Sequence, residues 1–123
     1  MENLNKKVLI VEDDKDFIWI LQQGFDKQGF SLIVAEDGEE GLKKIEEEKP
    51  DLILLDILLP KMDGVTVAKK LKERGIKAQI IFLSSLMGKV PVAEDLVPEA
   101  DYIIKSSMHI DQLLAKVKEK LGI

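Results

Sequence analysis

With 123 residues, nearly half of them apolar and a third charged, the chain is long enough for one hydrophobic core and too short for two ordinary domains, so we expect a single domain spanning residues 1–123. The absence of cysteine excludes disulfides and thiolate chemistry, and the net charge of −5 argues against direct nucleic-acid binding, which requires a positive surface. A polar start without an apolar targeting segment, together with apolar runs too short to cross a bilayer, indicates a cytoplasmic protein without membrane insertion.

Short apolar segments alternate with segments of helical periodicity along the chain. The first apolar segment, residues 7–11, ends in three consecutive acids, of which Asp14 is suited to cap the helix that follows. That helix should end at Gly29, and Ile18 and Trp19 should point away from its apolar face. The apolar face has helical spacing and consists of Phe17, Ile20, Leu21, Gly24 and Phe25.

The remaining elements continue the alternation. We expect strands over residues 30–35, 52–55, 79–83 and 101–104, and helices over 39–48 and 65–74. A last helix should begin with Ser107 as its cap, near His109, which we expect at the surface. Between residues 86 and 100 two prolines leave room for at most about two helical turns, so we expect a short, loosely held helix there. Alternation of this kind predicts an α/β fold, a doubly wound parallel sheet with helices on both faces.

The stretch 51–60 places one carboxylate, Asp56, inside a nearly continuous apolar run. The run is short, rich in branched residues and stopped by Pro60, which is typical of a buried strand in a parallel sheet. A buried, ionised Asp needs a cation or a position at the strand end, so we expect the strand to end near Leu55 and Asp56 to emerge at its carboxyl edge. Taken alone, the stretch is equally compatible with an Asp that caps a turn.

Other polar side chains also follow predicted strands. Because ligands bind outside the carboxyl ends of the strands in such a sheet, we expect one edge to gather Glu12, Asp13, Asp56, Ser84 and Lys105. Three neighbouring carboxylates repel one another unless a cation lies between them, and a set of oxygen ligands suits Mg²⁺ or Mn²⁺. Lys105 and Ser84 would then offer a positive charge and a hydroxyl donor to a phosphoryl group on Asp56. Each residue alone has an ordinary structural explanation, but their joint placement predicts a carboxylate nucleophile beside a metal.

The chain resembles the receiver domain of two-component response regulators over almost its whole length, and is similar to the single-domain chemotaxis type. The resemblance rests on residues 9–14 (LIVEDD), 35–42 (AEDGEEGL), 50–56 (PDLILLD), 60–64 (PKMDG) and 100–105 (ADYIIK). It implies a flavodoxin-like fold in which five parallel strands have the order 2-1-3-4-5.

The resemblance also implies a function in a phosphorelay. Asp56 would accept a phosphoryl group from a histidine kinase or a histidine phosphotransfer protein, and the phosphorylated state would alter binding to a downstream protein. The Mg²⁺ ligands that it implies are Glu12 (mainly through water), Asp13, Asp56 and the backbone carbonyl of Leu58. The residues that it places at the phosphoryl group or its switch are Ser84, Lys105 and Tyr102. Such a chain is not an enzyme beyond the gain and loss of its own phosphoryl group, and acts as a monomer or a weak, phosphorylation-dependent dimer.

The sequence departs from the family pattern at several positions. Ser106 replaces the usual proline after the lysine, so we predict a trans Lys105–Ser106 bond, because a cis bond before a residue other than proline costs about 2.5–4 kcal/mol. The weak helix between residues 86 and 100 puts the usual dimer contact in doubt. Leu58 and Leu86 are apolar where polar residues often flank the attacking water, which predicts slow hydrolysis of the acyl phosphate.

The first helix carries an aromatic side chain where a polar one is expected. Trp is a frequent interface anchor, and the first helix is where family members dock their kinases. We hypothesise a partner-docking surface that includes Phe17, Trp19 and Ile20. A stray surface aromatic is the alternative explanation.

Three other functions are weighed against the phosphoacceptor. A Mg²⁺-dependent phosphatase with an aspartyl-phosphate intermediate needs a second acid, commonly two residues after the nucleophile, where this chain has Leu58. A nucleotide binder needs a phosphate-binding loop after the first strand, where the acids at 12–14 would repel the phosphate. A pseudo-receiver acting purely as an interaction domain does not need the acceptor positions, all of which are filled here.

Overall fold

The computed structural model describes residues 6–85, 95, 97, 98 and 100–123. One parallel sheet has the order β2-β1-β3-β4-β5, as the resemblance implied. Its strands are β1 (Lys7–Val11), β2 (Ser31–Ala35), β3 (Leu52–Asp56), β4 (Gln79–Ser84) and β5 (Asp101–Ile104). The helices are α1 (Lys15–Gln28), α2 (Gly38–Glu48), α3 (Gly64–Glu73), α5 (Ile110–Leu121) and the 3₁₀ turn η1 (Lys105–Ser107). The short helix expected between residues 86 and 100 lies largely outside the described residues.

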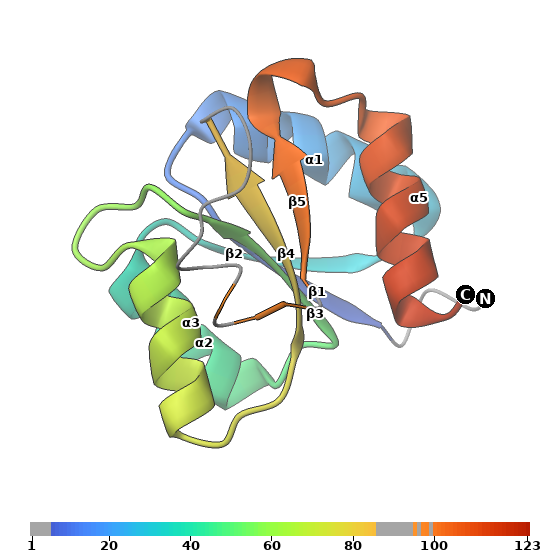
Figure 1. Ribbon diagram of the computed structural model, residues 1–123. Helices are drawn as coiled ribbons and strands as arrows, with labels where there is room; N and C mark the ends of the chain where they lie inside the picture. The colour runs from blue at the N-terminus through green and yellow to red at the C-terminus, as the bar shows by residue number, and fades with distance from the viewer. Residues whose placement is uncertain (1–5, 86–94, 96, 99) are drawn as a thin grey trace.

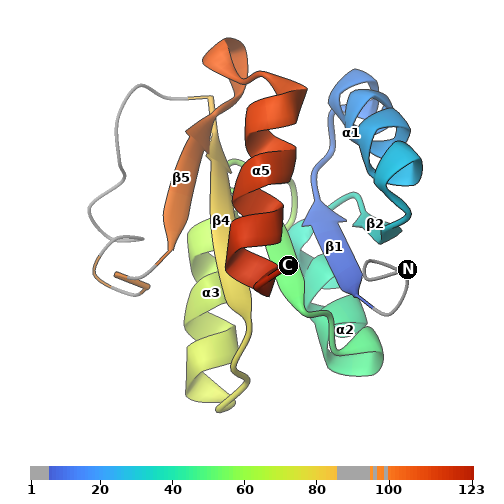
Figure 2. The same ribbon diagram turned by 90° about the vertical axis from the view of Figure 1, so that its right-hand side faces the viewer.

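Helices cover both faces of the sheet, α1 and α5 on one and α2 and α3 on the other (Figures 1 and 2). Successive side chains of a strand point to opposite faces, so the central strands need apolar residues at every position. The side chains that pack under α2 and α3 include Leu9, Val11, Ile53 and Leu55. Those that pack under α1 and α5 include Val8, Ile10, Leu52 and Leu54. The doubly wound architecture predicted from the alternation is confirmed.

The apolar face of α1 is rotated relative to the prediction. Ile18 is buried, with 7% of its surface exposed, whereas Ile20 is 44% exposed. The prediction was wrong for both residues because Ile18, Leu21 and Phe25 also have helical spacing, and the sequence does not decide between the two stripes. Trp19 is 61% exposed, as expected.

The start of α5 also differs from the prediction. Ser107 belongs to η1 and its hydroxyl donates to the carbonyl oxygen of Ile104 at 3.4 Å, so it does not cap α5. The residue before α5 is the exposed His109, which makes no capping hydrogen bond through its side chain. Asp14 caps α1 and Gly29 ends it, as predicted. In the described part of the chain, no helix is long and apolar enough to cross a membrane.

Candidate functional site

The register of the parallel strands brings the predicted site residues to one edge of the sheet. Val11 pairs with Leu55, so Glu12 follows β1 beside Asp56, the last residue of β3. Asp56 pairs with Leu83, and Ser84 pairs with Ile104, which precedes Lys105. The carboxyl ends of four neighbouring strands therefore deliver three acids, a hydroxyl and an ammonium group to the same place.

The acidic cluster consists of Glu12, Asp13 and Asp56. Each of them offers a carboxylate oxygen, and these three oxygens lie within 4.8 Å of one another. Glu12 is fully buried and Asp56 is 3% exposed, whereas Asp13 is exposed. The cluster is thus held in the fold on one side and open to solvent on the other, so a hydrated cation has a route to it.

Lys105 connects two of these acids. Its Nζ lies 2.7 Å from Glu12 Oε1 and 3.2 Å from Asp56 Oδ2, and its side chain is only 16% exposed. Burial lowers the pKa of Lys105, but the hydrogen bond with Glu12 and the charges of Asp56 and Glu12 outweigh it, so the pKa of Lys105 is raised overall. The ammonium remains charged, and the cluster keeps an excess of negative charge that suits a divalent cation.

Glu12 is oriented by the backbone that follows it. Its Oε2 accepts hydrogen bonds from Asp13 N at 2.9 Å and Asp14 N at 3.0 Å. The pKa of Glu12 is raised to about 7, mainly by burial and also by neighbouring Asp56, against the lowering effects of Lys105 and the Asp14 backbone. The buried Oε1 of Glu12 forms its ion pair with the Lys105 ammonium at 2.7 Å. A divalent cation at this oxygen would therefore compete with the lysine for its charge.

The backbone around Asp56 is fixed by close packing. Leu58 N donates to Asp56 Oδ1 at 3.1 Å, and Gly64 N donates to the carbonyl oxygen of Ile57 at 2.8 Å. A Cβ on Gly64 would lie 2.1 Å from the Asp56 carbonyl oxygen, so only glycine permits this approach. The carboxylate thus leaves the strand end in a defined direction.

The two predicted switch residues lie on the neighbouring strands. Ser84 is the last residue of β4 and is 1% exposed. On β5, the ring of Tyr102 stacks on Phe82 with a centroid distance of 5.3 Å, and its hydroxyl oxygen is buried. The peptide bond between Lys105 and Ser106 is trans, as predicted.

The other predicted positions are placed as follows. The side chain of Leu58 is 54% exposed beside Asp56, and Leu86 lies outside the described residues. Phe17 was grouped with the docking residues, but it is only 8% exposed and offers little surface to a partner. Its ring instead lies 4.9 Å from Lys105 Nζ, a contact that the sequence analysis missed. No sequence signal reports it, because Phe17 satisfies the ordinary pattern of an apolar helix face.

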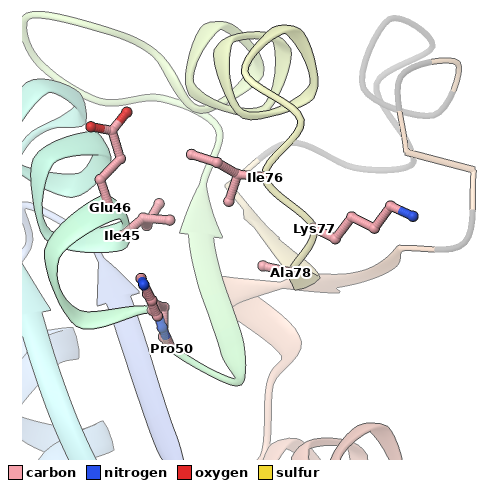
Figure 3. Close-up of a pocket in the computed structure, with 7 residues that line it drawn as sticks. Ile45, Glu46, Pro50, Ile76, Lys77 and Ala78 are labelled. Carbon is pink, nitrogen blue, oxygen red and sulfur yellow. The ribbon is translucent and has the colours of Figure 1, made fainter.

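A separate hollow lies at the opposite end of the sheet and is not a second active site. It holds about 330 Å³ and is lined by Ile45, Glu46, Lys49, Pro50, Ile76, Lys77 and Ala78. Figure 3 shows the side chain of Lys77 extending away from Ile45 and Pro50. Glu46 is paired with Arg74. The polar groups do not converge on the hollow, as they do in ligand sites.

The fold and the acidic edge define a doubly wound α/β protein with a cluster of carboxylates, able to hold a metal ion, at the carboxyl ends of its strands. The family model of the response regulator receiver domain matches residues 8–118, so the chain belongs to this family of two-component signalling domains. Receiver domains generally bind Mg²⁺ at an acidic pocket and interact with histidine kinases. The acidic cluster agrees with that chemistry.

Two proteins to which the chain is similar are transcriptional regulators. The chain is 45% identical over 82 residues to the alkaline phosphatase synthesis transcriptional regulatory protein PhoP of Bacillus subtilis, an alignment covering 67% of this chain and 34% of PhoP. It is 36% identical over 112 residues to the transcriptional regulatory protein DltR of Streptococcus agalactiae, covering 91% of this chain and 50% of DltR. The chain therefore spans between a third and half of the length of these relatives.

Solved receiver domains have the same fold. The receiver domain of the Francisella response regulator 1452 superposes with a TM-score of 0.86 at 32% identity, covering 96% of this chain and 98% of that one. The BeF3-activated N-terminal receiver domain of RstA from Klebsiella pneumoniae superposes with a TM-score of 0.85 at 30% identity, covering 96% of this chain and 100% of that one.

Proposed function

We propose that the chain is a phosphoacceptor switch in which Asp56 receives a phosphoryl group from a histidine kinase or a histidine phosphotransfer protein. The observation that carries this proposal is the position of Asp56 at the end of β3, 3% exposed, with Lys105 Nζ 3.2 Å from its Oδ2 and two further acids beside it. A carboxylate in this setting is a nucleophile with a cation already in place to balance the charge of the product.

Glu12, Asp13 and Asp56 fit Mg²⁺ (or Mn²⁺) by donor type, and the close approach of their three carboxylate oxygens, within 4.8 Å of one another, supports the assignment. Asp13 and Asp56 would bind the ion directly together with the carbonyl of Leu58, and Glu12 would act mainly through water. When bound, the ion supplies a Lewis acid that offsets the negative charge shared by the carboxylates and the incoming phosphoryl group.

In the transfer step, a carboxylate oxygen of Asp56 attacks the phosphorus of a phosphohistidine. The new P–O bond forms as the P–N bond breaks, and the imidazole keeps the electron pair and takes a proton from solvent. Lys105 then exchanges its ion pair with Asp56 for one with the phosphoryl oxygens, and Ser84 donates its hydroxyl to them. Tyr102 follows Ser84 in changing position, which gives the two states of the switch.

The proposal is tested by incubating the protein with acetyl phosphate and Mg²⁺ and measuring the intact mass. We expect one added phosphoryl group in the wild type, none in Asp56→Asn, and none without a divalent metal. Equal labelling of Asp56→Asn would place the acceptor elsewhere. Absence of labelling in every sample would favour a pseudo-receiver that acts by interaction alone.

The same experiment also tests a second function, that of a phosphatase with an aspartyl-phosphate intermediate. It would release phosphate from acetyl phosphate over many turnovers and would not accumulate the modified form. The exposed, apolar Leu58 stands where the second acid of such an enzyme is commonly found. We therefore propose that the chain catalyses only the gain and loss of its own phosphoryl group.

The surface proposed for docking the phosphodonor lies on α1 and α5. Trp19 and Ile20 are exposed there, beside a hollow of about 400 Å³ that extends to Ile110 and Leu114. Exposed apolar side chains beside a shallow hollow are typical of interaction sites. The downstream partner is an unidentified protein, and because this segment is acidic we propose that it does not contact DNA itself, even though its relatives are transcriptional regulators. We expect a monomer or a weak, phosphorylation-dependent dimer.

A further inference from the structure

The ammonium group of Lys105 has an aromatic neighbour that the proposed phosphotransfer does not use. We propose that Phe17 is a positioning residue, whose ring holds the Lys105 ammonium at the site when a metal ion binds the carboxylates. The inference rests on the proposed function and adds a residue of this chain to its machinery.

Three groups surround the ammonium. The carboxylates of Glu12 and Asp56 lie at 2.7 and 3.2 Å, and the centroid of the Phe17 ring lies 4.9 Å from Nζ. The face of an aromatic ring carries negative partial charge and attracts a cation within about 6 Å, more strongly when the contact is shielded from water. Both side chains are shielded here, since Lys105 is 16% and Phe17 8% exposed.

The carboxylates cannot hold the lysine alone once the site is loaded. They are also the groups that would bind the divalent ion, which competes with the ammonium for their charge and repels it. The lysine stem is long and flexible, and an ammonium without partners would move into solvent. The ring of Phe17 is neutral and offers no ligand to Mg²⁺, so it is the one of these three contacts that the metal leaves intact.

The fold holds the Phe17 ring in place before any ligand arrives. Phe17 lies in the first turn of α1, where its backbone N–H donates to Asp14 Oδ1 at 3.2 Å. Its side chain belongs to the apolar cluster between the sheet and α1 and α5. Because only the acidic turn separates α1 from β1, the same short connection that presents Glu12 and Asp13 also places the ring against Lys105.

The test measures the affinity for fluoroberyllate, an unreactive mimic of a phosphoryl group on a carboxylate, by calorimetry at saturating Mg²⁺. Phe17→Leu removes the ring, and pentafluorophenylalanine at position 17 keeps its shape while reversing the charge of its face. We expect both to bind fluoroberyllate about tenfold more weakly than the wild type, with unchanged affinity for Mg²⁺ alone. Phe17→Tyr keeps the aromatic face and should restore wild-type binding.

A second readout reports the contact directly. In the Mg²⁺-loaded wild type, the ring current of Phe17 should shift the NMR signals of the Lys105 Cε protons upfield, and Phe17→Leu should abolish this shift. Wild-type affinity in the pentafluorophenylalanine protein, or an Mg²⁺-loaded wild type without the shift, overturns the inference. If the wild type binds no fluoroberyllate, the proposed function fails, and the ring-current shift still decides whether Phe17 holds the ammonium in the presence of Mg²⁺.

Discussion

Leu58 is an apolar residue exposed to solvent beside the proposed acceptor. Its side chain is 54% exposed two positions after Asp56, while its backbone N–H donates to Asp56 Oδ1. An apolar side chain cannot accept a hydrogen bond from an attacking water, so it neither orients nor holds one. The acyl phosphate should consequently be lost slowly.

We predict that Leu58→Asn shortens the lifetime of phosphorylated Asp56 by about fivefold, the equivalent of one net hydrogen bond. The measurement is the decay of the phosphorylated intact mass after acetyl phosphate is removed. Leu58→Met, which is similar in volume and apolar, should decay like the wild type. If the Asn variant also decays at the wild-type rate, the apolar character of this position does not control hydrolysis.

At the scale of single residues, the sequence was sufficient to predict that the charged residues gather at one edge of the sheet. It was not sufficient to predict the contact of Phe17 with one of them. Glu12, Asp56 and Lys105 each directly follow or end an apolar strand, and parallel register then brings strand ends together whatever the details of packing. The contact between Phe17 and Lys105 depends on where a flexible lysine stem turns. Spacing along the chain contains no information about that direction.

At the scale of elements, the N-terminus of α2 is fixed by a reciprocal pair of hydrogen bonds. Asp37 Oδ1 accepts from Glu40 N at 2.8 Å, and Glu40 Oε1 accepts from Glu36 N at 3.0 Å. This is a variant of the capping box, in which the second donor is the N–H of Glu36, one residue before the cap Asp37, and two backbone donors at the helix start are satisfied. The hydrogen bond from Glu40 N holds the pKa of Asp37 below its usual value, burial opposes this, and the nearby ammonium of Lys61 adds to it.

A lowered pKa in the folded state means that the ionised Asp37 stabilises the fold above its unfolded pKa of about 3.8, and that this contribution is lost as the pH falls through the folded value. We predict that Asp37→Asn, which still caps but carries no charge, is less stable than the wild type at pH 7 and that the difference shrinks as the pH falls toward the folded pKa of Asp37. Urea unfolding between pH 7 and pH 3 measures it. Glu47→Gln, which alters an exposed carboxylate of α2 outside the capping box, should show no such trend. A difference as large at pH 3 as at pH 7 would contradict the assignment.

The elements themselves were predictable where a local signal fixes them and not where two packings compete. The ends of α1 were predicted correctly at Asp14 and Gly29, because a helix start needs an oxygen acceptor and this helix ends with a residue in the left-handed conformation. The rotation of α1 was missed because Ile18 and Ile20 are equally apolar, and spacing along the chain does not decide between them. Where α1 meets α5, a Cβ on Gly24 would lie 2.7 Å from Ile110 Cγ1, so the two helices approach closely at this point.

At the scale of the whole molecule, alternation of strands and helices was sufficient for a parallel sheet covered on both faces. It was not sufficient for the strand order, which local pattern does not encode and which came from the resemblance to receiver domains. The order matters for the site, because it makes β1 and β3 neighbours and places β4 and β5 beyond them. Glu12 after β1 and Asp56 at the end of β3 therefore meet Lys105, which follows β5, at the carboxyl ends of the strands.

At the scale of the whole molecule, the exposed Trp19 lies on the side of the sheet that α1 and α5 cover. Trp19 is 61% exposed on α1, next to Ile20 and the hollow toward α5. If this surface docks the phosphodonor, Trp19→Ala should slow phosphotransfer by about tenfold or more, as expected for an aromatic interface anchor. The assay uses the purified histidine kinase that phosphorylates the wild type fastest among a panel. Labelling by acetyl phosphate should remain at the wild-type rate, because the acidic cluster is untouched.

Lys69→Ala, which changes an exposed residue of α3 on the other face, is the matched control and should behave as the wild type with both donors. Unchanged transfer to Trp19→Ala would show that Trp19 is a surface aromatic outside the docking site.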